Sequence, residues 1–188
     1  TKSTTAHSTL ALVGLRCSGK STLARRLAQA LHRQYVDLDD ALLAAANENE
    51  PGGDRFESSG DVLAELGESA FRDLEAATLA RVLASPQPLV LATGGGIVER
   101  PANRALLRDR AAVVWLTADV PTLQARMRAS HLRRPPLLGT DAVTEVPDLA
   151  TRRAPLYAEV ADLTVDTAKS PPEALVTEIL SAGLVPAP

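Results

Sequence analysis

The stretch Gly14-Leu15-Arg16-Cys17-Ser18-Gly19-Lys20-Ser21-Thr22 has the pattern G-x-x-x-x-G-K-[ST] of a phosphate-binding loop. It follows the apolar run 9–13, which predicts a buried strand, and it precedes residues 20–33, where apolar side chains recur at helical spacing. In a strand–loop–helix unit of this kind, backbone N–H groups and the helix N-terminus bind phosphate. The sequence therefore predicts a nucleoside-triphosphate site at 14–22, with Lys20 on the outer phosphates and Ser21 on Mg²⁺.

The distribution of lysine argues against a chance match. Of the 20 basic residues, only Lys2, Lys20 and Lys169 are lysines, and one of them stands at the motif position. The remaining basic residues are arginines, so the lysine at this position is informative.

Bulk composition limits the class of protein. A chain of 188 residues, with 45% hydrophobic and 23% charged residues, suits one globular domain. The net charge of −3 and 3% aromatic residues predict no nucleic-acid binding, and no apolar run is long enough to span a membrane. One cysteine, Cys17, allows no internal disulfide, and three histidines form no metal-ligand cluster. We expect a cytoplasmic monomer.

Apolar strands alternate with helical patterns along the chain. Strands are predicted at 9–13, 35–38, 88–93, 112–116 and 162–165, and helices at 20–33, 61–84, 102–109, 119–129, 146–160 and 171–182. This alternation predicts an α/β fold of three layers, α/β/α, with a five-stranded parallel sheet. We expect a single domain over 9–182, flexible tails at 1–8 and 183–188, and a ligand site at the carboxyl ends of the strands.

Two segments have the composition of mobile loops. Residues 47–54 are polar and rich in turn formers, and residues 130–139 combine Arg133 and Arg134 with proline and glycine. The second segment suits a lid that closes over phosphates, and the alternative is a solvated surface loop.

Asp37 and Asp39 lie at the end of the second predicted strand. Because alternate residues of a strand point to the same side, both carboxylates are expected to face the ligand site. One could hold Mg²⁺ and the other could bind or deprotonate a substrate hydroxyl. The alternative is that Asp39 or Asp40 caps a helix, which explains one aspartate of the three.

Glycines and arginines mark a second part of the predicted site. Gly94, Gly95 and Gly96 end the third strand, where they let the backbone approach a ligand closely. Arg72 has Glu75 one helical turn later, and Arg153 supplies another guanidinium. Arginine suits a planar carboxylate, although each of these residues alone could be a surface ion pair.

Taken together, the segments GLRCSGKST, YVDLD, GESAFRDLE, ATGGGIV, RRPPLL and TRRAPLY resemble shikimate kinases, in order and spacing, over about residues 9–182. The resemblance implies a P-loop kinase fold of the nucleoside-monophosphate-kinase type, with a lid near 130–140 and a helical substrate-binding region near 40–75. It implies transfer of the γ-phosphate of MgATP to the 3-hydroxyl of shikimate, giving shikimate 3-phosphate and ADP.

The same resemblance implies roles for individual residues. It makes Lys20, Asp39 and Arg134 catalytic, and it places Ser21 and Asp37 at Mg²⁺. The ATP site would add Arg126 and Arg134 to the phosphate loop, and either Arg126 or Arg128 would stack on adenine. The substrate site would comprise Asp39, Phe71, Arg72, Gly94, Gly95, Gly96 and Arg153.

Three features depart from the family pattern. Cys17 replaces a usual loop glycine, the lid has RPPL in place of RPLL, and the stretch from Asp39 to Arg72 is roughly nine residues longer, around 47–57. Two alternatives stay open: a kinase of another small hydroxy acid or cyclitol, and a ligand-sensing module on this fold. The pair Arg72 and Arg153 argues against a neutral polyol, and intact Lys20 and Asp39 argue against a sensor.

Overall fold

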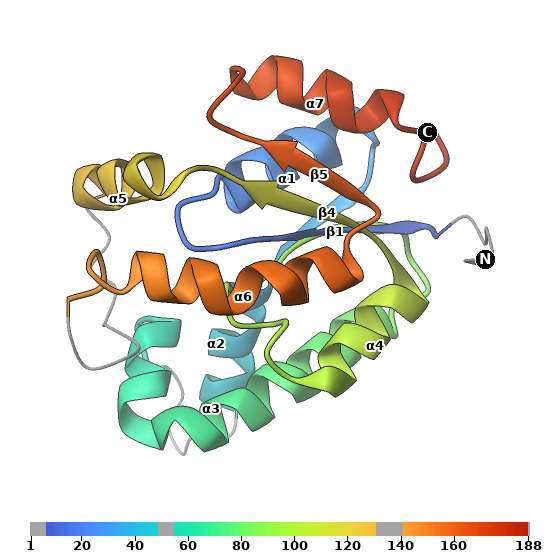
Figure 1. Ribbon diagram of the computed structural model, residues 1–188. Coiled ribbons are helices and arrows are strands. Elements are labelled where there is room, and N and C mark those ends of the chain that lie inside the picture. Colours follow the sequence, from blue (N-terminus) through green and yellow to red (C-terminus); the bar gives the residue numbers. More distant parts are fainter. Residues whose placement is uncertain (1–6, 49–54, 131–140, 188) are drawn as a thin grey trace.

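A computed structural model describes residues 7–48, 55–130 and 141–187, and five of its segments are strands of one sheet (Figure 1). The strands are β1 (Thr9–Val13), β2 (Gln34–Asp37), β3 (Leu89–Ala92), β4 (Ala111–Thr117) and β5 (Leu163–Asp166). They lie in the order β2-β3-β1-β4-β5, and every neighbouring pair is parallel. The predicted five-stranded parallel sheet is therefore confirmed.

Helices cover both faces of the sheet (Figure 1). Leu10 and Leu12 of β1 pack with α1 (Lys20–Ala30) and α7 (Pro172–Ser181). Ala11 and Val13, which point the other way, pack with α3 (Ser59–Leu83), α4 (Pro101–Arg110) and α6 (Val146–Val160). The three-layer α/β/α fold is confirmed. The fifth helix, α5 (Val120–Ala129), follows β4.

A helix that the sequence analysis did not predict follows β2 directly. The helix α2 spans Leu38–Glu48, so β2 ends at Asp37 rather than at residue 38. The Asp37 carboxylate accepts a hydrogen bond from the Asp39 N–H at 3.1 Å, as a helix-capping side chain does. Asp37 is thus the cap, and Asp39 lies in the first helical turn, not on the strand as predicted.

A small separate core joins α2 to α3. It contains Leu42 and Ala46 of α2, Phe56, and Val62 and Phe71 of α3. The Asn47 side chain exchanges two hydrogen bonds of 3.0 Å with the backbone of Phe56. The predicted insertion around 47–57 is therefore tied at both ends to this core, while residues 49–54 lie outside the described residues.

The helix α3 is interrupted at Gly67. Its φ of 76° and ψ of 166° are not helical, and such a φ suits glycine. The first segment of α3 consequently changes direction relative to the second, which carries Phe71 and Arg72. Ser59, Gly60 and Leu63 of the first segment line the same pocket as Arg72.

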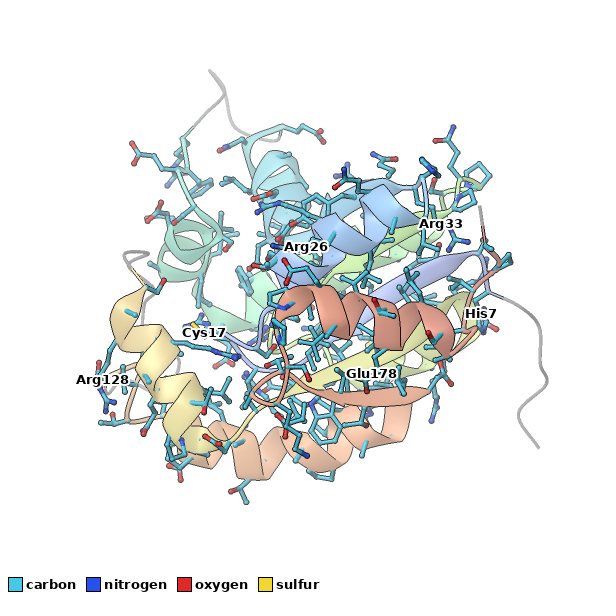
Figure 2. The ribbon with its side chains drawn as sticks, turned by 90° about the horizontal axis from the view of Figure 1, so that it is seen from above. His7, Cys17, Arg26, Arg33, Arg128 and Glu178 are labelled. Carbon is cyan, nitrogen blue, oxygen red and sulfur yellow. The ribbon has the colours of Figure 1, made fainter. Side chains whose placement is uncertain are left out.

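The two ends of the described chain meet at the edge opposite the phosphate loop. Figure 2 shows His7, before β1, and Cys17, after it, at opposite ends of the molecule. Leu184 and Val185 pack against the core, and Arg33 donates to the Ser8 and Pro186 carbonyls at 2.7 and 2.6 Å. The segment predicted as a tail from 183 therefore makes packing contacts up to at least Pro186. No helix among the described residues is long and apolar enough to cross a membrane.

Candidate active site

The loop between β1 and α1 has positive φ angles at Gly14, Cys17 and Gly19, and only the two glycines adopt them without strain. Gly14 has a φ of 144°, and a Cβ there would lie 2.3 Å from the Leu116 carbonyl oxygen, so glycine is required. Gly19 precedes α1 with a φ of 94°. Cys17 adopts a φ of 62°, which is unfavourable for a residue with a Cβ. Glycine, which is usual at this position in the family, would adopt such a φ without strain, and Cys17 adopts it despite its Cβ.

Lys20 lies at the start of α1 and closes this loop. Its Nζ donates to the carbonyl oxygens of Gly14 at 2.9 Å and Leu15 at 2.7 Å. The side chain is largely buried, at 9% residue exposure, beneath a cavity of about 150 Å³. We call this cavity the phosphate pocket; it is lined by Cys17, Gly19, Lys20, Ser21, Thr22, Asp37, Asp39, Thr93, Gly94 and Gly95. The predicted loop residues 17 and 19–22 therefore converge there.

The side-chain oxygens of Ser21 and Asp37 lie together in the phosphate pocket, where they could act as metal ligands. The Ser21 hydroxyl donates to Asp37 Oδ2 at 2.8 Å, and the Tyr35 hydroxyl donates to the same oxygen at 2.8 Å. Burial, reinforced by Asp37, raises the pKa of Tyr35 to about 12, so the phenol stays a donor. Hydroxyl and carboxylate oxygens suit Mg²⁺, which protein sites usually bind through one or two such groups together with substrate phosphates.

The described residues offer no alternative metal centre. No group of three or more His, Cys, Asp or Glu side chains in 7–48, 55–130 and 141–187 could hold an ion. The side-chain oxygens of Ser21 and Asp37 are the groups in the phosphate pocket that could hold a metal together with a nucleotide.

The turn after β3 needs glycine because charged side chains approach it closely. A Cβ on Gly96 would lie 2.4 Å from Arg72 Nη1, and a Cβ on Gly94 would lie 2.9 Å from Glu75 Oε1 and 3.2 Å from Asp39 Oδ1. Neither glycine has a positive φ. The glycines therefore allow a close approach, as predicted. The groups nearest to Gly94 and Gly96 are charged side chains of the protein itself.

Arg72 and Glu75 form a buried ion pair beside this turn. Arg72 Nη1 donates to Glu75 Oε2 at 2.9 Å, and the two side chains are 10% and 3% exposed. Burial tends to lower the pKa of Arg72, but the Glu75 carboxylate raises it overall, so the guanidinium stays charged. Burial raises the pKa of Glu75, against the opposing effect of Arg72, and the nearby Asp39 charge adds to the rise. The predicted interaction of Glu75 with the Arg72 guanidinium is therefore present.

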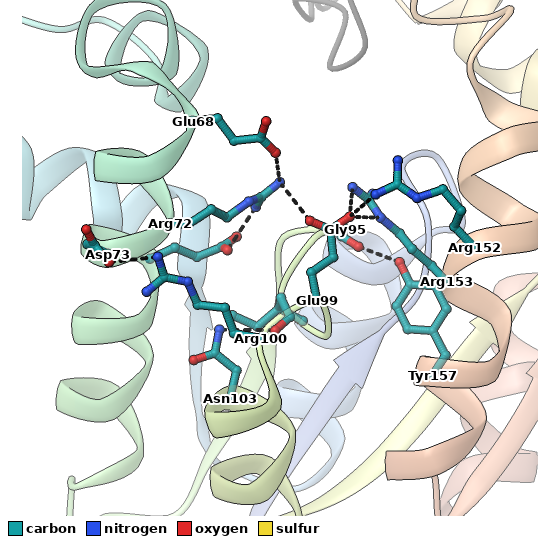
Figure 3. A network of polar contacts seen from close by, with 12 residues as sticks. Glu68, Arg72, Asp73, Gly95, Glu99, Arg100, Asn103, Arg152, Arg153 and Tyr157 are labelled. Carbon is teal, nitrogen blue, oxygen red and sulfur yellow. Dashed lines mark hydrogen bonds and ion pairs between the residues drawn. The ribbon is translucent and has the colours of Figure 1, made fainter.

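Arg153 reaches the same place from α6. Its Nη2 and Nε contact Glu99 Oε1 at 2.7 and 2.9 Å, and Arg72 Nη2 lies 3.8 Å from Glu99 Oε2 (Figure 3). Tyr157, one turn after Arg153, donates its hydroxyl to the Gly95 carbonyl, and burial raises the pKa of Tyr157. Neither Glu99 nor the contact of Tyr157 is predictable from local sequence patterns, because both contacts join segments far apart in the chain.

Arg72 and Arg153 open into a second cavity, which we call the arginine pocket. It is lined by Arg16, Asp39, Ser59, Gly60, Leu63, Phe71, Arg72, Glu75, Gly94, Gly95, Gly96 and Arg153. All the residues predicted for the substrate are among these, and Arg16, predicted for ATP, lies here rather than in the phosphate pocket. Asp39, Gly94 and Gly95 line both pockets, so the two cavities meet at Asp39.

The remaining predicted ATP residues lie around the loop. Arg126 donates to the Thr167 hydroxyl and carbonyl at 2.8 and 2.7 Å, and its Nη1 lies 3.4 Å from the Cys17 carbonyl oxygen. It therefore links the phosphate loop to the segment after β5. Arg128 lies in the last turn of α5, while Arg134 and most of the predicted lid lie outside the described residues.

A larger cavity, of about 290 Å³, lies away from this site. It is lined by apolar residues at the start of β1 and the ends of α1 and α7, among them Leu10, Leu31 and Ile179. The described residues that line it are all uncharged, and none of them belongs to the site described above.

Comparison with known proteins agrees with this geometry. The model of the shikimate kinase family matches residues 16–183. The shikimate kinase of Caulobacter vibrioides is 42% identical over 174 residues, which cover 93% of this chain and 81% of the relative. That of Thioalkalivibrio sulfidiphilus is 41% identical over 175 residues, covering 93% and 86%. The structure of the shikimate kinase from Acinetobacter baumannii in complex with shikimate is similar with a TM-score of 0.81 at 31% identity, covering 95% and 93%. The chain belongs to the shikimate kinase family.

Proposed function

We propose that this protein transfers the γ-phosphate of MgATP to the 3-hydroxyl of shikimate, giving shikimate 3-phosphate and ADP. The single observation that supports this most is the junction of two chemically different pockets at Asp39. One pocket suits phosphates and the other, which contains the guanidinium groups of Arg72 and Arg153, suits a carboxylate. A hydroxy acid that spans the arginine pocket would present a hydroxyl to Asp39, next to the phosphates.

The proposed roles follow from these positions. Lys20 and the loop N–H groups hold the β- and γ-phosphates, and Arg72 and Arg153 hold the substrate carboxylate. Asp39 accepts the hydroxyl proton while the hydroxyl oxygen bonds to the γ-phosphorus and the bond to the bridging oxygen of ADP breaks. Gly94 and Gly95 line the boundary between the two substrates, and Phe71 provides an apolar wall.

Mg²⁺ is part of this proposal, with Ser21 and Asp37 as the groups that would hold it. When bound with the nucleotide, it would neutralise charge on the β- and γ-phosphate oxygens. Tyr35 and the Asp39 N–H fix the orientation of the Asp37 carboxylate, as their hydrogen bonds of 2.8 and 3.1 Å indicate.

Support for shikimate comes from the relatives, whose names give shikimate kinase, and from a similar structure described as a complex with shikimate. The carboxylate-binding character of Arg72 and Arg153 favours shikimate over a neutral cyclitol. Arg126 stacking on adenine, Arg134 acting from the lid, a monomeric state and a cytoplasmic location also remain proposals.

A coupled ADP-release assay with shikimate, quinate and neutral cyclitols tests the proposal. We expect shikimate to be the preferred acceptor, and Arg72→Ala and Arg153→Ala to raise its KM about 10- to 150-fold, because a charge-assisted hydrogen bond contributes about 1.5–3 kcal/mol. The KM for ATP should stay nearly constant. Preference for another acceptor, or equal effects on both KM values, would contradict the proposal.

A further inference from the structure

The turn after the three glycines places a carboxylate between Arg72 and Arg153 of the arginine pocket. Glu99 Oε1 contacts Arg153 Nη2 and Nε at 2.7 and 2.9 Å, and Glu99 Oε2 faces Arg72 Nη2 at 3.8 Å (Figure 3). Arg152, which is exposed, adds a contact of 3.8 Å to Oε1. Glu99 itself is absent from the lining of the pocket. The carboxylate therefore contacts both arginines without contributing to the cavity wall.

The backbone that carries Glu99 is firmly held. The Glu99 N–H donates to the Gly96 carbonyl at 3.0 Å, and Arg104 of α4 donates to the Val98 and Glu99 carbonyls at 2.7 and 3.2 Å. Asn103 donates to the Ile97 carbonyl at 3.1 Å. Hydrogen bonds from α4 and to Gly96 fix the backbone of this turn, so the Glu99 carboxylate can hold Arg153 in one position.

Two guanidinium groups that converge on one ligand repel each other when the ligand is absent. Arg153 is only 3% exposed and Arg72 only 10%, so solvent screens this repulsion poorly. Glu75 compensates Arg72 from one side, and Glu99 compensates Arg153 from the other. The Glu99 contact uses the Nε and Nη2 edge of Arg153, while Nη1 lies beside Gly95 at the pocket wall. The contacts of Glu99 thus involve Nε and Nη2, on the edge of the guanidinium away from Gly95.

We propose that Glu99 is a positioning residue that holds Arg153, and through it the arginine pair, in the geometry that selects a carboxylate-bearing substrate. The inference rests on the proposed function, because it concerns the same substrate. A pre-oriented guanidinium loses less conformational freedom on binding, so its hydrogen bonds contribute more to affinity. Glu99 thus determines how strongly the pocket prefers an acid to its neutral analogue.

The test measures dissociation constants for shikimate and for methyl shikimate, its uncharged ester, by titration calorimetry. Glu99→Gln keeps the shape of the side chain and removes its charge. We expect the shikimate Kd to rise about tenfold, as for loss of a charge-assisted contact, with less than about a twofold change for the ester. The KM for ATP should stay unchanged, which also shows that the variant is folded.

A matched control is Glu159→Gln. Glu159 also bridges two arginines, Arg104 at 2.7 Å and Arg108 at 3.1 Å, but it does so between α6 and α4, away from the pocket. Arg104 also donates to the backbone of the turn that carries Glu99. If a loosened turn alone weakened shikimate binding, Glu159→Gln should therefore weaken it as well. We expect Glu159→Gln to leave both dissociation constants unchanged.

A double-mutant cycle tests the route of the effect. If Glu99 acts through Arg153, Glu99→Gln should change the shikimate Kd less than about twofold in an Arg153→Ala background. Should Glu99→Gln fail to fold, Glu99→Asp keeps the charge on a shorter side chain, and we expect it to raise the shikimate Kd and not the ester Kd.

The outcomes separate this inference from the proposed function. Wild-type protein that neither binds nor phosphorylates shikimate would overturn both. Wild-type activity with an unchanged shikimate Kd in Glu99→Gln would overturn the positioning role alone. A lower Kd in that variant would also overturn it, since Glu99 would then compete with the substrate carboxylate.

Discussion

Gly96→Ala is the substitution whose effect the structure defines most sharply. A Cβ there would lie 2.4, 2.5 and 2.6 Å from Nη1, Nη2 and Cζ of Arg72, whereas ordinary contacts begin at 3.4 Å. The guanidinium must therefore move by about 1 Å. Moving it that far from Glu75 would stretch their 2.9 Å contact beyond hydrogen-bonding distance. Because the clash involves the end of a flexible side chain and not backbone, we expect the fold to survive.

The expected result is a selective loss of affinity for the acid substrate. A charge-assisted hydrogen bond contributes about 1.5–3 kcal/mol, so the KM for shikimate should rise about 10- to 150-fold while the KM for ATP stays within about twofold. Steady-state kinetics with each substrate varied in turn measures both values. The KM for ATP, measured on the same variant, is the control for a general disturbance of the site. An unchanged KM for shikimate in Gly96→Ala, or an equal rise in both KM values, would refute the reasoning.

Three further outcomes follow from the site. Lys20→Ala should reduce phosphoryl transfer by more than tenfold without unfolding the protein, as activity and thermal denaturation would show, because its charge stabilises the transferring phosphate. Asp39→Asn should lower kcat by about 10²–10⁴-fold with MgATP binding nearly unchanged, while Asp37→Asn should shift the Mg²⁺ requirement; identical Mg²⁺ and shikimate titrations for both would contradict these separate roles. Burial raises the pKa of Glu75 above its ordinary 4.5, so the native state binds this proton at higher pH than the unfolded chain. Urea unfolding should consequently show the wild type losing stability relative to Glu75→Gln as the pH rises from 4.5 through that raised pKa, and a relative gain would contradict the shift.

The sheet and its covering helices were predictable because their signals are local. A continuous apolar strand such as 9–13 and the helical spacing of 20–33 each identify one element without knowledge of the rest. The helix α2 was missed because it begins at the residue after β2, with no turn residues between them. Asp37 does end β2 and also caps α2, whereas Asp39 lies in the first helical turn.

The site was predictable where a motif identifies it. The phosphate loop, Asp39 and Arg72 have local patterns, and the structure places Asp39 at the junction of both pockets, although for a different reason from strand alternation. Glu99 has no such pattern. It meets Arg153, 54 positions later, only because α6 packs beside the turn after β3, and a single sequence contains no signal for that contact.

Arg72 and Arg153 are thus held by carboxylates of different origin. Glu75 comes from the same helix as Arg72, three residues later, while Glu99 comes from another segment of the fold. Local pairing fixes a side chain relative to its own helix only, whereas the Glu99 contact fixes α6 relative to the glycine turn. If that contact positions the pair, removing it should impair recognition of the carboxylate while leaving Arg72 and Glu75 joined. The affinity for the acid would then depend on the packing of α6 against the turn, not on the arginines alone.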